Sequence, residues 1–300
     1  MIRDCLFALI GVVLIVINTL AHIVPLFLVS FIKILIPVGM VRRSCSRTLA
    51  WVVESWVAVN SALIVLMTHT RFHVSGIGNL SRDASYLVLS NHQSWVDIPV
   101  LQKTFNRRIP FMRFFLKSQL IWVPVLGLAW WALDFPFMKR HSRAVLERHP
   151  HLGDQDMEAT RRVCQRFRGI PVSIMNFVEG TRLRPERHSR QASPYRYLLR
   201  PKSGGVAFVM SAMGDTLRSV LDVTIVYPHG QPSMLHLVMN RITDIHVIVR
   251  EHPIPVELRL GNCEIDREYR ARVQRWLNTL WSEKDMLTGE IIKDYTSVGI

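Results

Sequence analysis

A histidine and an aspartate lie five residues apart in the segment NHQSWVD, which runs from Asn91 to Asp97. The preceding stretch, Tyr86 to Ser90 (YLVLS), is typical of a short buried strand, so His92 is expected at the edge of a sheet, where ligands bind. Asp97 then falls about one turn into the following helix, from which its carboxylate can reach one imidazole nitrogen. Such a carboxylate fixes the tautomer and raises the basicity of the other nitrogen, which suits His92 to take a proton from a substrate hydroxyl. Taken alone the spacing is a weak signal, because most such pairs are structural.

A second candidate is the segment FVEGTR, from Phe177 to Arg182, at the end of another predicted strand. Gly180 permits a tight turn, and Arg182 can hold a phosphate through two parallel hydrogen bonds. Glu179 could either anchor a substrate hydroxyl or orient the loop. An ordinary strand-end turn with a solvated arginine is equally typical of this pattern when it stands alone.

The charge balance points to an anionic partner. Lysine and arginine outnumber aspartate and glutamate by 37 to 23, giving a formal charge of +14, which favours a phospholipid surface, a phosphorylated substrate or nucleic acid. The stretch from Arg182 to Lys202 is strongly basic and is expected to face lipid head groups. Lys202 precedes Ser203, Gly204 and an apolar helical stretch, where a glycine-rich helix entry could bind an anion or simply begin the helix.

The N-terminal region is the most apolar part of the chain. From Cys5 to Ile32 the apolar run is interrupted by Asn18, His22 and Pro25, and about 20 apolar residues suffice to cross a bilayer. The run is too long for a signal-peptide core and no cleavage site follows, so we expect a retained anchor. A second apolar stretch runs from Ala50 to Met67.

Several arrangements of this anchor are open. The basic cluster at Arg42, Arg43 and Arg47 favours the cytoplasmic face, and a turn at Pro25 would produce a hairpin that returns to the same side. A hairpin or shallow amphipathic anchor is favoured over two simple spans, while the second stretch is equally consistent with a core helix. The expected organisation is a membrane-anchoring region over 1–67 and one catalytic domain over 68–300.

The remainder of the chain predicts an α/β fold in which helices flank a mixed sheet, behind the helical anchor. Further strands are predicted over 171–178, 220–227, 233–240 and 243–249, and a helix over 153–167. A C-terminal helix is predicted from apolar residues at helical spacing, namely Tyr269, Val273, Trp276, Leu277, Leu280 and Trp281.

No metal site or cofactor is expected. The four cysteines are scattered without a CxxC pair, and the histidines at positions 141, 149 and 151 lack ligand spacing. Trp122, Trp130 and Trp131 lie in an apolar segment that could form an interfacial surface, an acyl-chain lining or ordinary core.

Together, NHxxxxD and the EGTR segment that follows it resemble the motifs of the glycerolipid acyltransferases, the 1-acylglycerol-3-phosphate O-acyltransferase (PlsC-like) family. The resemblance covers roughly residues 65–230. The stretches from Gly127 to Pro150 and from Trp276 to Asp285 are similar to a bacterial inner-membrane branch called YihG.

The resemblance implies direct transfer of a fatty acyl group from acyl-CoA or acyl carrier protein to a lysophospholipid hydroxyl, with 1-acylglycerol-3-phosphate as the expected acceptor. It implies His92 as general base and Asp97 as its orienting partner. The implied substrate-binding residues are Arg140, Glu179, Gly180, Thr181 and Arg182. The family's late strand resembles residues 223–228 and would help line the acyl site. Membrane lipids are expected partners and nucleic acid is not; the expected location is the bacterial inner membrane, with the catalytic domain facing the cytoplasm.

The sequence departs from the family pattern in two places. Val178 replaces the usual proline, and Asp134 and Pro136 replace small or aliphatic residues before the second motif (Phe137 to Arg140). Neither departure removes a catalytic group, but because of both the family pattern says less about which head group the acceptor lipid carries.

Two other classes of function compete with this interpretation. A metal-dependent phosphoester hydrolase or nuclease would use Asp97 and Glu179 to bind magnesium, and chelators would inhibit it. A non-catalytic membrane scaffold would use its basic face to recruit partners, and its function would not depend on His92.

Overall fold

The computed structural model describes most of the chain outside one long internal segment. The described residues are 2–114, 116–123, 126–135, 137–138, 170–259, 261 and 266–297. The predicted helix over 153–167, and the second-motif residues from 139 onward, lie outside them.

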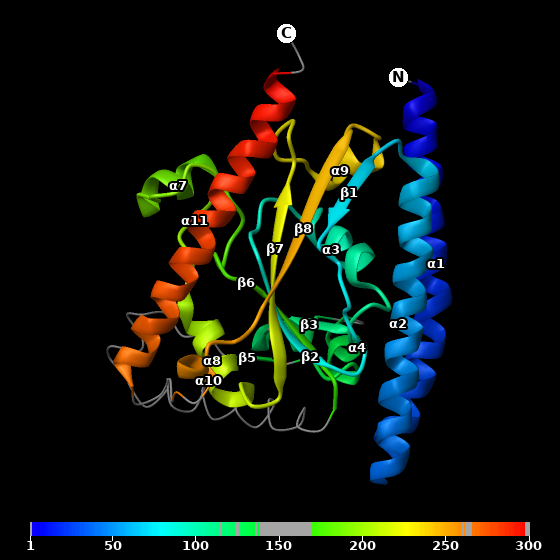
Figure 1. Cartoon of the computed structure of the whole chain (residues 1–300). Helices are drawn as coiled ribbons and strands as arrows, with labels where there is room; N and C mark the ends of the chain where they lie inside the picture. Colours follow the sequence, from blue (N-terminus) through cyan, green and yellow to red (C-terminus); the bar gives the residue numbers. More distant parts are fainter. Residues whose placement is uncertain are drawn as a thin grey trace.

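Two long antiparallel helices form the N-terminal part of the structure (Figure 1). Helix α1 spans Ile2–Leu35 and helix α2 spans Gly39–Met67. Both are long and apolar enough to cross a membrane, judged by length and composition. Most of α1 is exposed, whereas α2 buries one side against α1 and the α/β domain and exposes Trp51 and Leu66 on the other.

Several polar residues inside these apolar stretches lie at the contact between the two helices. The Asn18 side chain donates to the carbonyl of Trp56 and to the side chain of Asn60, and His22 contacts Ser55. Pairing in this way removes the cost of unsatisfied polar groups in an apolar environment.

The predicted turn at Pro25 is wrong. Helix α1 continues through Pro25, and the chain turns at residues 36–38, around Pro37. A proline inside a helix removes one hydrogen bond but need not end the helix, whereas Pro37 disfavours helical geometry at the residue before it.

The α/β domain contains a six-stranded mixed sheet with the order β1-β8-β7-β2-β6-β3. Strands β7, β2 and β6 lie side by side and run parallel, while β8 runs antiparallel to β7. Strands β4 and β5 form a separate parallel pair. The strands are β1 (Arg71–Ser75), β2 (Ser85–Ser90), β3 (Met112–Phe114), β4 (Leu116–Lys117), β5 (Phe137–Met138), β6 (Ser173–Phe177), β7 (Leu217–Val226) and β8 (Asp244–His252).

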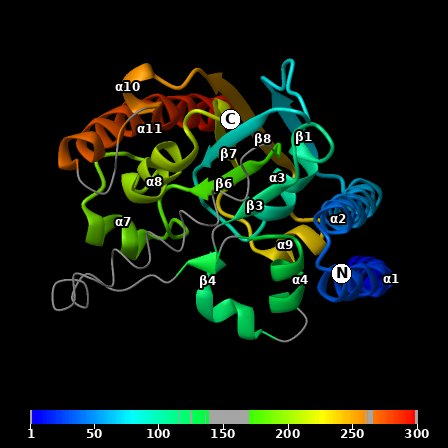
Figure 2. The ribbon, with the colours of Figure 1, turned by 90° about the horizontal axis from the view of Figure 1, so that it is seen from below.

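Helices cover both faces of the sheet, as Figure 2 shows from below. The alternation of side chains along β2 explains the two layers: Leu87 and Leu89 pack with α8 and α11, whereas Tyr86 and Val88 pack with α3. The remaining helices are α3 (Asp97–Phe105), the 3₁₀ helix η1 (Ser118–Trp122), α4 (Leu126–Ala132), α7 (Pro185–Gln191), α8 (Ser203–Met213), α9 (Met234–Val238), α10 (Val256–Arg259) and α11 (Arg267–Ser297).

The strands predicted from apolar runs are confirmed in β2, β6, β7 and β8, and the C-terminal stripe is buried on α11 except for the half-buried Trp276. The strand predicted over 233–240 is wrong, because this segment forms helix α9. Ser233 explains the difference: its hydroxyl accepts from the His236 amide, and the His236 ring accepts from the Ser233 amide. This reciprocal capping stabilises a helix start that apolar spacing does not reveal.

Candidate active site

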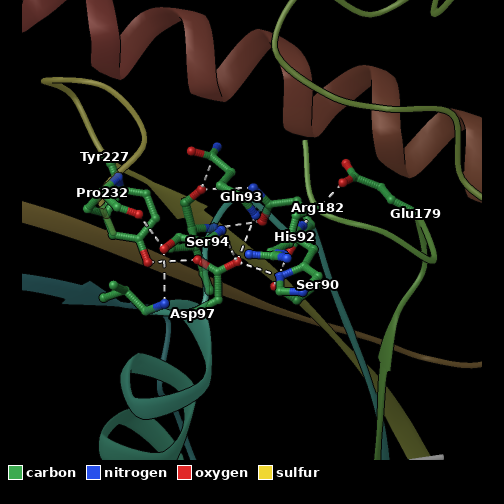
Figure 3. A network of polar contacts seen from close by, with 12 residues as sticks. Ser90, His92, Gln93, Ser94, Asp97, Glu179, Arg182, Tyr227 and Pro232 are labelled. Carbon is green, nitrogen blue, oxygen red and sulfur yellow. Dashed lines mark hydrogen bonds and ion pairs between the residues drawn. The ribbon is translucent and has the colours of Figure 1, made fainter. Parts of the chain in front are cut away.

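The candidate site lies at the carboxyl ends of the neighbouring parallel strands β7, β2 and β6. His92 follows β2, Glu179 follows β6 and Tyr227 follows β7. Parallel strands deliver the residues after them to one edge of a sheet, so three segments far apart in sequence meet there (Figure 3).

His92 and Asp97 form a close pair. The Nδ1 atom of His92 lies 2.7 Å from Oδ2 of Asp97, which is the first residue of α3. A carboxylate only accepts, so Nδ1 carries the hydrogen and Nε2 has a free lone pair. Among the described residues Nε2 has no hydrogen-bond partner, and the side chain keeps 12% of its surface exposed. This arrangement suits a general base.

Three more donors hold the Asp97 carboxylate. The backbone amides of Gln93 and Ser94 donate to Oδ2 at 2.7 and 2.9 Å, and the Tyr227 hydroxyl donates to Oδ1 at 2.7 Å. Burial, and then the neighbouring Asp97 charge, raise the pKa of Tyr227 well above its usual value, so the phenol stays protonated and remains a donor. Asp97 is therefore fully buried, with both of its carboxylate oxygens accepting hydrogen bonds.

Two contacts hold His92 and the backbone beside it in position. The Phe177 ring stacks on the His92 ring, with centroids 3.9 Å apart. The side-chain amide of Asn91 donates to the carbonyl of Ile225 on β7 and accepts from the backbone N–H of the same residue. Phe177 and Asn91 therefore restrict the rotation of the imidazole and the position of its backbone.

Glu179 joins three parts of the domain. It is 1% exposed, and its carboxylate accepts from the His92 amide at 3.3 Å, the Leu199 amide at 3.2 Å and the Trp281 indole at 3.4 Å. Of the two roles that the sequence left open, these contacts favour orientation of the loop. Burial raises the pKa of Glu179 to about 8, although the hydrogen bonds oppose this shift.

The raised pKa makes stability depend on pH. The unfolded glutamate has a pKa near 4.5, so between 4.5 and about 8 the folded protein keeps a proton that the unfolded chain has released. The stabilisation is complete below the lower value and declines as the pH rises through this window, by roughly 1.4 kcal/mol per pH unit. The Glu179→Gln variant does not titrate there and should lose less stability with rising pH than the wild type.

Chemical denaturation in detergent at several pH values in this window measures the difference. The Glu186→Gln variant, altered at an exposed carboxylate, should follow the wild-type profile. Identical pH slopes for the wild type and Glu179→Gln would contradict a protonated Glu179 in the folded protein.

The turn that follows Glu179 contains the predicted residues Gly180, Thr181 and Arg182. Gly180 has a φ of +70°, which favours glycine, and a Cβ atom there would lie 3.3 Å from the Lys202 ammonium. An Arg187 guanidinium N–H donates to the Thr181 hydroxyl. The Arg182 guanidinium lies over the Trp95 ring, 4.5 Å from its centroid.

This turn also contacts the histidine segment directly, because the amide of Leu183 donates to the carbonyl of His92 at 2.8 Å. Val178, which replaces the family's proline, donates its amide to the carbonyl of Ser90 at 3.3 Å, a bond that proline lacks. Arg182 is thus held against Trp95 of the segment that carries His92, Lys202 lies beside Gly180, and Arg140 lies outside the described residues.

Sequence reasoning did not foresee the roles of three residues of this site, although Tyr227 was expected to help line the acyl site. Tyr227 orients Asp97, Phe177 stacks on His92, and Trp95 supports Arg182. Trp95 and Phe177 lie within the two motifs and Tyr227 follows β7, which was the signal that the sequence offered. Which residues these three side chains contact depends on the order of the strands in the sheet.

The carboxylates of the site are occupied by donors of the protein itself. Within the described part of the chain, no group of three or more histidine, cysteine, aspartate or glutamate residues could hold a metal ion. The oxygens of Asp97 and Glu179 accept hydrogen bonds from separate partners, a geometry that does not favour their sharing a magnesium ion.

Known proteins are similar to this chain over most of its length. The Acyltransferase family model matches residues 71–229. Lysocardiolipin acyltransferase 1 of Gallus gallus is 24% identical over 286 residues, covering 88% of this chain and 70% of that protein. The 1-acyl-sn-glycerol-3-phosphate acyltransferase gamma of Homo sapiens is 24% identical over 182 residues, covering 57% of this chain and 43% of that protein.

The fold has a solved counterpart. The crystal structure of the 1-acyl-sn-glycerophosphate (LPA) acyltransferase PlsC from Thermotoga maritima aligns with a TM-score of 0.52 and 20% identity, covering 94% of this chain and 97% of that one. With the family match over residues 71–229, the chain belongs to the Acyltransferase family and is an acyltransferase enzyme.

Proposed function

We propose that this enzyme transfers a fatty acyl group from acyl-CoA or acyl carrier protein to the free hydroxyl of a lysophospholipid. The expected acceptor is 1-acylglycerol-3-phosphate, which would yield phosphatidic acid. The observation that carries the proposal is the His92–Asp97 pair, held at a sheet edge beside an arginine that can receive a phosphate.

The proposed reaction needs no nucleophile from the enzyme. Asp97 holds the hydrogen of Nδ1, and Nε2 of His92 takes the proton from the acceptor hydroxyl as its oxygen attacks the thioester carbonyl. The tetrahedral intermediate then collapses, the carbon–sulfur bond breaks, and the imidazolium returns its proton to the departing thiolate. The products are an ester and a free thiol, and His92 is neutral again.

The acceptor phosphate would bind on the basic side of the site. Arg182 is oriented by Trp95, and the Lys202 ammonium lies beside Gly180. A phosphate monoester carries up to two negative charges, which suits converging cations. Arg140, from the second motif, is proposed as a further ligand on the basis of the family resemblance.

A small cavity near the site, about 40 Å³ in volume and lined by both apolar and polar side chains, is proposed as one end of the acyl-chain site. Its lining includes Val57 of α2, Phe105 of α3, Phe111 and Phe114. Phe114 packs against Phe177 with ring centroids 6.1 Å apart, and Phe177 in turn stacks on His92. The pocket is thus separated from the general base by one aromatic side chain.

The proposed location is the bacterial inner membrane, with the catalytic domain on the cytoplasmic side, and the proposed branch of the family is YihG. The two apolar helices support membrane attachment. The arginines at the start of α2, Arg42, Arg43 and Arg47, favour the cytoplasmic face.

Acyl transfer by purified protein in detergent tests the proposal. A panel of lysophosphatidate, other lysophospholipids and the uncharged monoacylglycerol should be offered with acyl-CoA and with acyl carrier protein as donors. Transfer that favours lysophosphatidate supports the proposed acceptor, and preference for another lysophospholipid corrects only the head group. Hydrolysis of phosphoesters that chelators suppress, without any acyl transfer, would favour the hydrolase alternative.

A change at Arg182 tests the phosphate site. The Arg182→Gln variant removes a charge-assisted contact worth about 1.5–3 kcal/mol, so kcat/KM for lysophosphatidate should fall about 10- to 100-fold. Most of this loss should appear in the KM for the acceptor, with little change in the KM for acyl-CoA. The Arg190→Gln variant, altered at an exposed arginine of α7, provides the control and should retain wild-type kinetics. Equal KM values for Arg182→Gln and wild type would remove Arg182 from the phosphate site.

A further inference from the structure

A segment of the catalytic domain is apolar and exposed although it lies outside the two long helices. Residues 118–133 (SQLIWVPVLGLAWWAL) contain no charged side chain and lie between Lys117 and Asp134. The segment includes η1 and α4, and the Trp122 side chain at the end of η1 is 85% exposed. Other exposed large apolar side chains of the segment are Ile121, Leu126, Leu128 and Trp131. Clustered exposure of this kind marks a contact with a membrane or another protein.

Polar contacts hold the end of this segment against the anchor helices. The buried Lys33 ammonium of α1 donates to the carbonyl of Ala132 at 2.7 Å and pairs with Asp134 at 2.9 Å. The Ser46 hydroxyl of α2 also donates to Asp134, at 3.1 Å. An apolar cluster joins the same elements and contains Leu26, Leu49, Val52, Ala132, Leu133 and Phe135. The depth of α4 in a membrane would therefore follow the depth of α1.

Helices α1 and α4 both lie away from α11 (Figure 2). Helix α1 contacts α4 directly. Exposed Arg42, Arg43 and Arg47 lie in the first turns of α2, close to Ser46 and hence to the end of α4. The exposed apolar side chains of η1 and α4 thus belong to a segment packed against α1 and close to positive charge, which is complementary to anionic lipid head groups.

We propose that η1 and α4 form a second membrane contact, which inserts Trp122 into the interface of a bilayer that contains anionic phospholipid. Tryptophan suits this position because its ring is apolar and its indole N–H reaches water or head groups. Together, α1 and the η1–α4 surface give the catalytic domain two linked points of attachment. The domain is then held along the membrane surface instead of projecting from it on the anchor alone. This inference rests on the proposed membrane attachment of α1, which the experiment measures separately.

Single-cysteine probes can locate the surface. In a background whose four natural cysteines are replaced by alanine, cysteines are introduced as Trp122→Cys, Leu20→Cys and Met286→Cys. All three sites are exposed, at 85%, 58% and 63%; Leu20 reports on α1, and Met286 on α11 serves as the aqueous control. The variants, checked for acyl transfer, are labelled with an environment-sensitive dye and placed in vesicles of phosphatidylethanolamine and phosphatidylglycerol. Iodide quenches dyes in water, and doxyl-labelled lipid quenches dyes in the membrane.

The expected result is that the dyes at positions 122 and 20 are quenched by doxyl lipid and are protected from iodide about threefold or more relative to position 286. Iodide quenching at position 122 equal to that at 286, with position 20 in lipid, would overturn the second contact and leave membrane attachment intact. Aqueous behaviour at both 122 and 20 would overturn the inference and the proposed attachment together. Protection of position 122 from both quenchers would show that protein covers the surface, and would also overturn the inference.

Discussion

The His92→Ala variant is expected to lose acyl transfer down to the background rate while it still folds and binds membranes. Among the described residues of the site, His92 is the one group whose free nitrogen, Nε2, can take the acceptor proton, and alanine removes that base. General-base catalysis contributes about 10²- to 10⁴-fold, so kcat should fall by at least this range. Single-turnover acyl transfer at saturating acceptor and donor measures the chemical step.

The Asp97→Asn variant refines the same prediction. The asparagine oxygen can still accept from the Gln93 and Ser94 amides and from Nδ1, but the neutral side chain no longer stabilises the imidazolium that forms when Nε2 takes the proton. The expected fall in kcat is also about 10²- to 10⁴-fold, with small changes in KM. The exposed Asp83, near the start of β2, provides a matched control, and Asp83→Asn should remain active. Activity of His92→Ala or Asp97→Asn comparable to wild type would overturn the mechanism and favour the scaffold alternative.

The Lys284→Met variant is expected to lower the free energy of unfolding by about 3–5 kcal/mol, because it leaves a buried charge without its partner. The fully buried Lys284 ammonium pairs with Asp222 at 2.8 Å and donates to the carbonyl of Val223 at 2.6 Å. Burial lowers the pKa of Lys284, and Asp222 opposes this effect by favouring the charged form. The loss should be measurable by chemical denaturation in detergent.

Two variants separate the ion pair from other effects of this change. Lys293→Met alters an exposed lysine of the same helix and should change stability by less than about 0.5 kcal/mol. The double variant Lys284→Met with Asp222→Asn should recover part of the lost stability, since no unpaired charge remains. A single Lys284→Met variant as stable as the wild type would show that the ion pair contributes nothing net.

Lys284 has a further connection to the site. Trp281, one turn earlier on α11, donates to Glu179, which accepts from the amide of His92. A displaced α11 would therefore disturb the histidine segment. Transfer activity of Lys284→Met should fall together with its stability.

Much of the fold was predictable because its signals are local. The apolar runs that form β2, β6 and β7 lie within single elements, and the stripe of α11 repeats with the helical period. The reciprocal cap at Ser233 involves only neighbouring residues, yet the apolar run there still led to a wrong prediction of a strand.

The pairing of His92 with Asp97 was predictable for the same reason. A strand end followed by the first turn of a helix brings the two side chains together whatever the rest of the fold, and the hydrogen bond between them is present. The sequence by itself thus determined the contact between His92 and Asp97, the turn at Gly180 and the presence of long apolar helices.

Tertiary structure alone decided which distant residues support that pair. Tyr227 reaches Asp97 across 130 positions, Glu179 reaches His92 across 87, and Lys33 reaches Asp134 across 101. These contacts depend on the order and register of strands and on how α1 packs against α4. Strand order and helix packing arise from the burial of many side chains at once, so no short stretch of sequence encodes them.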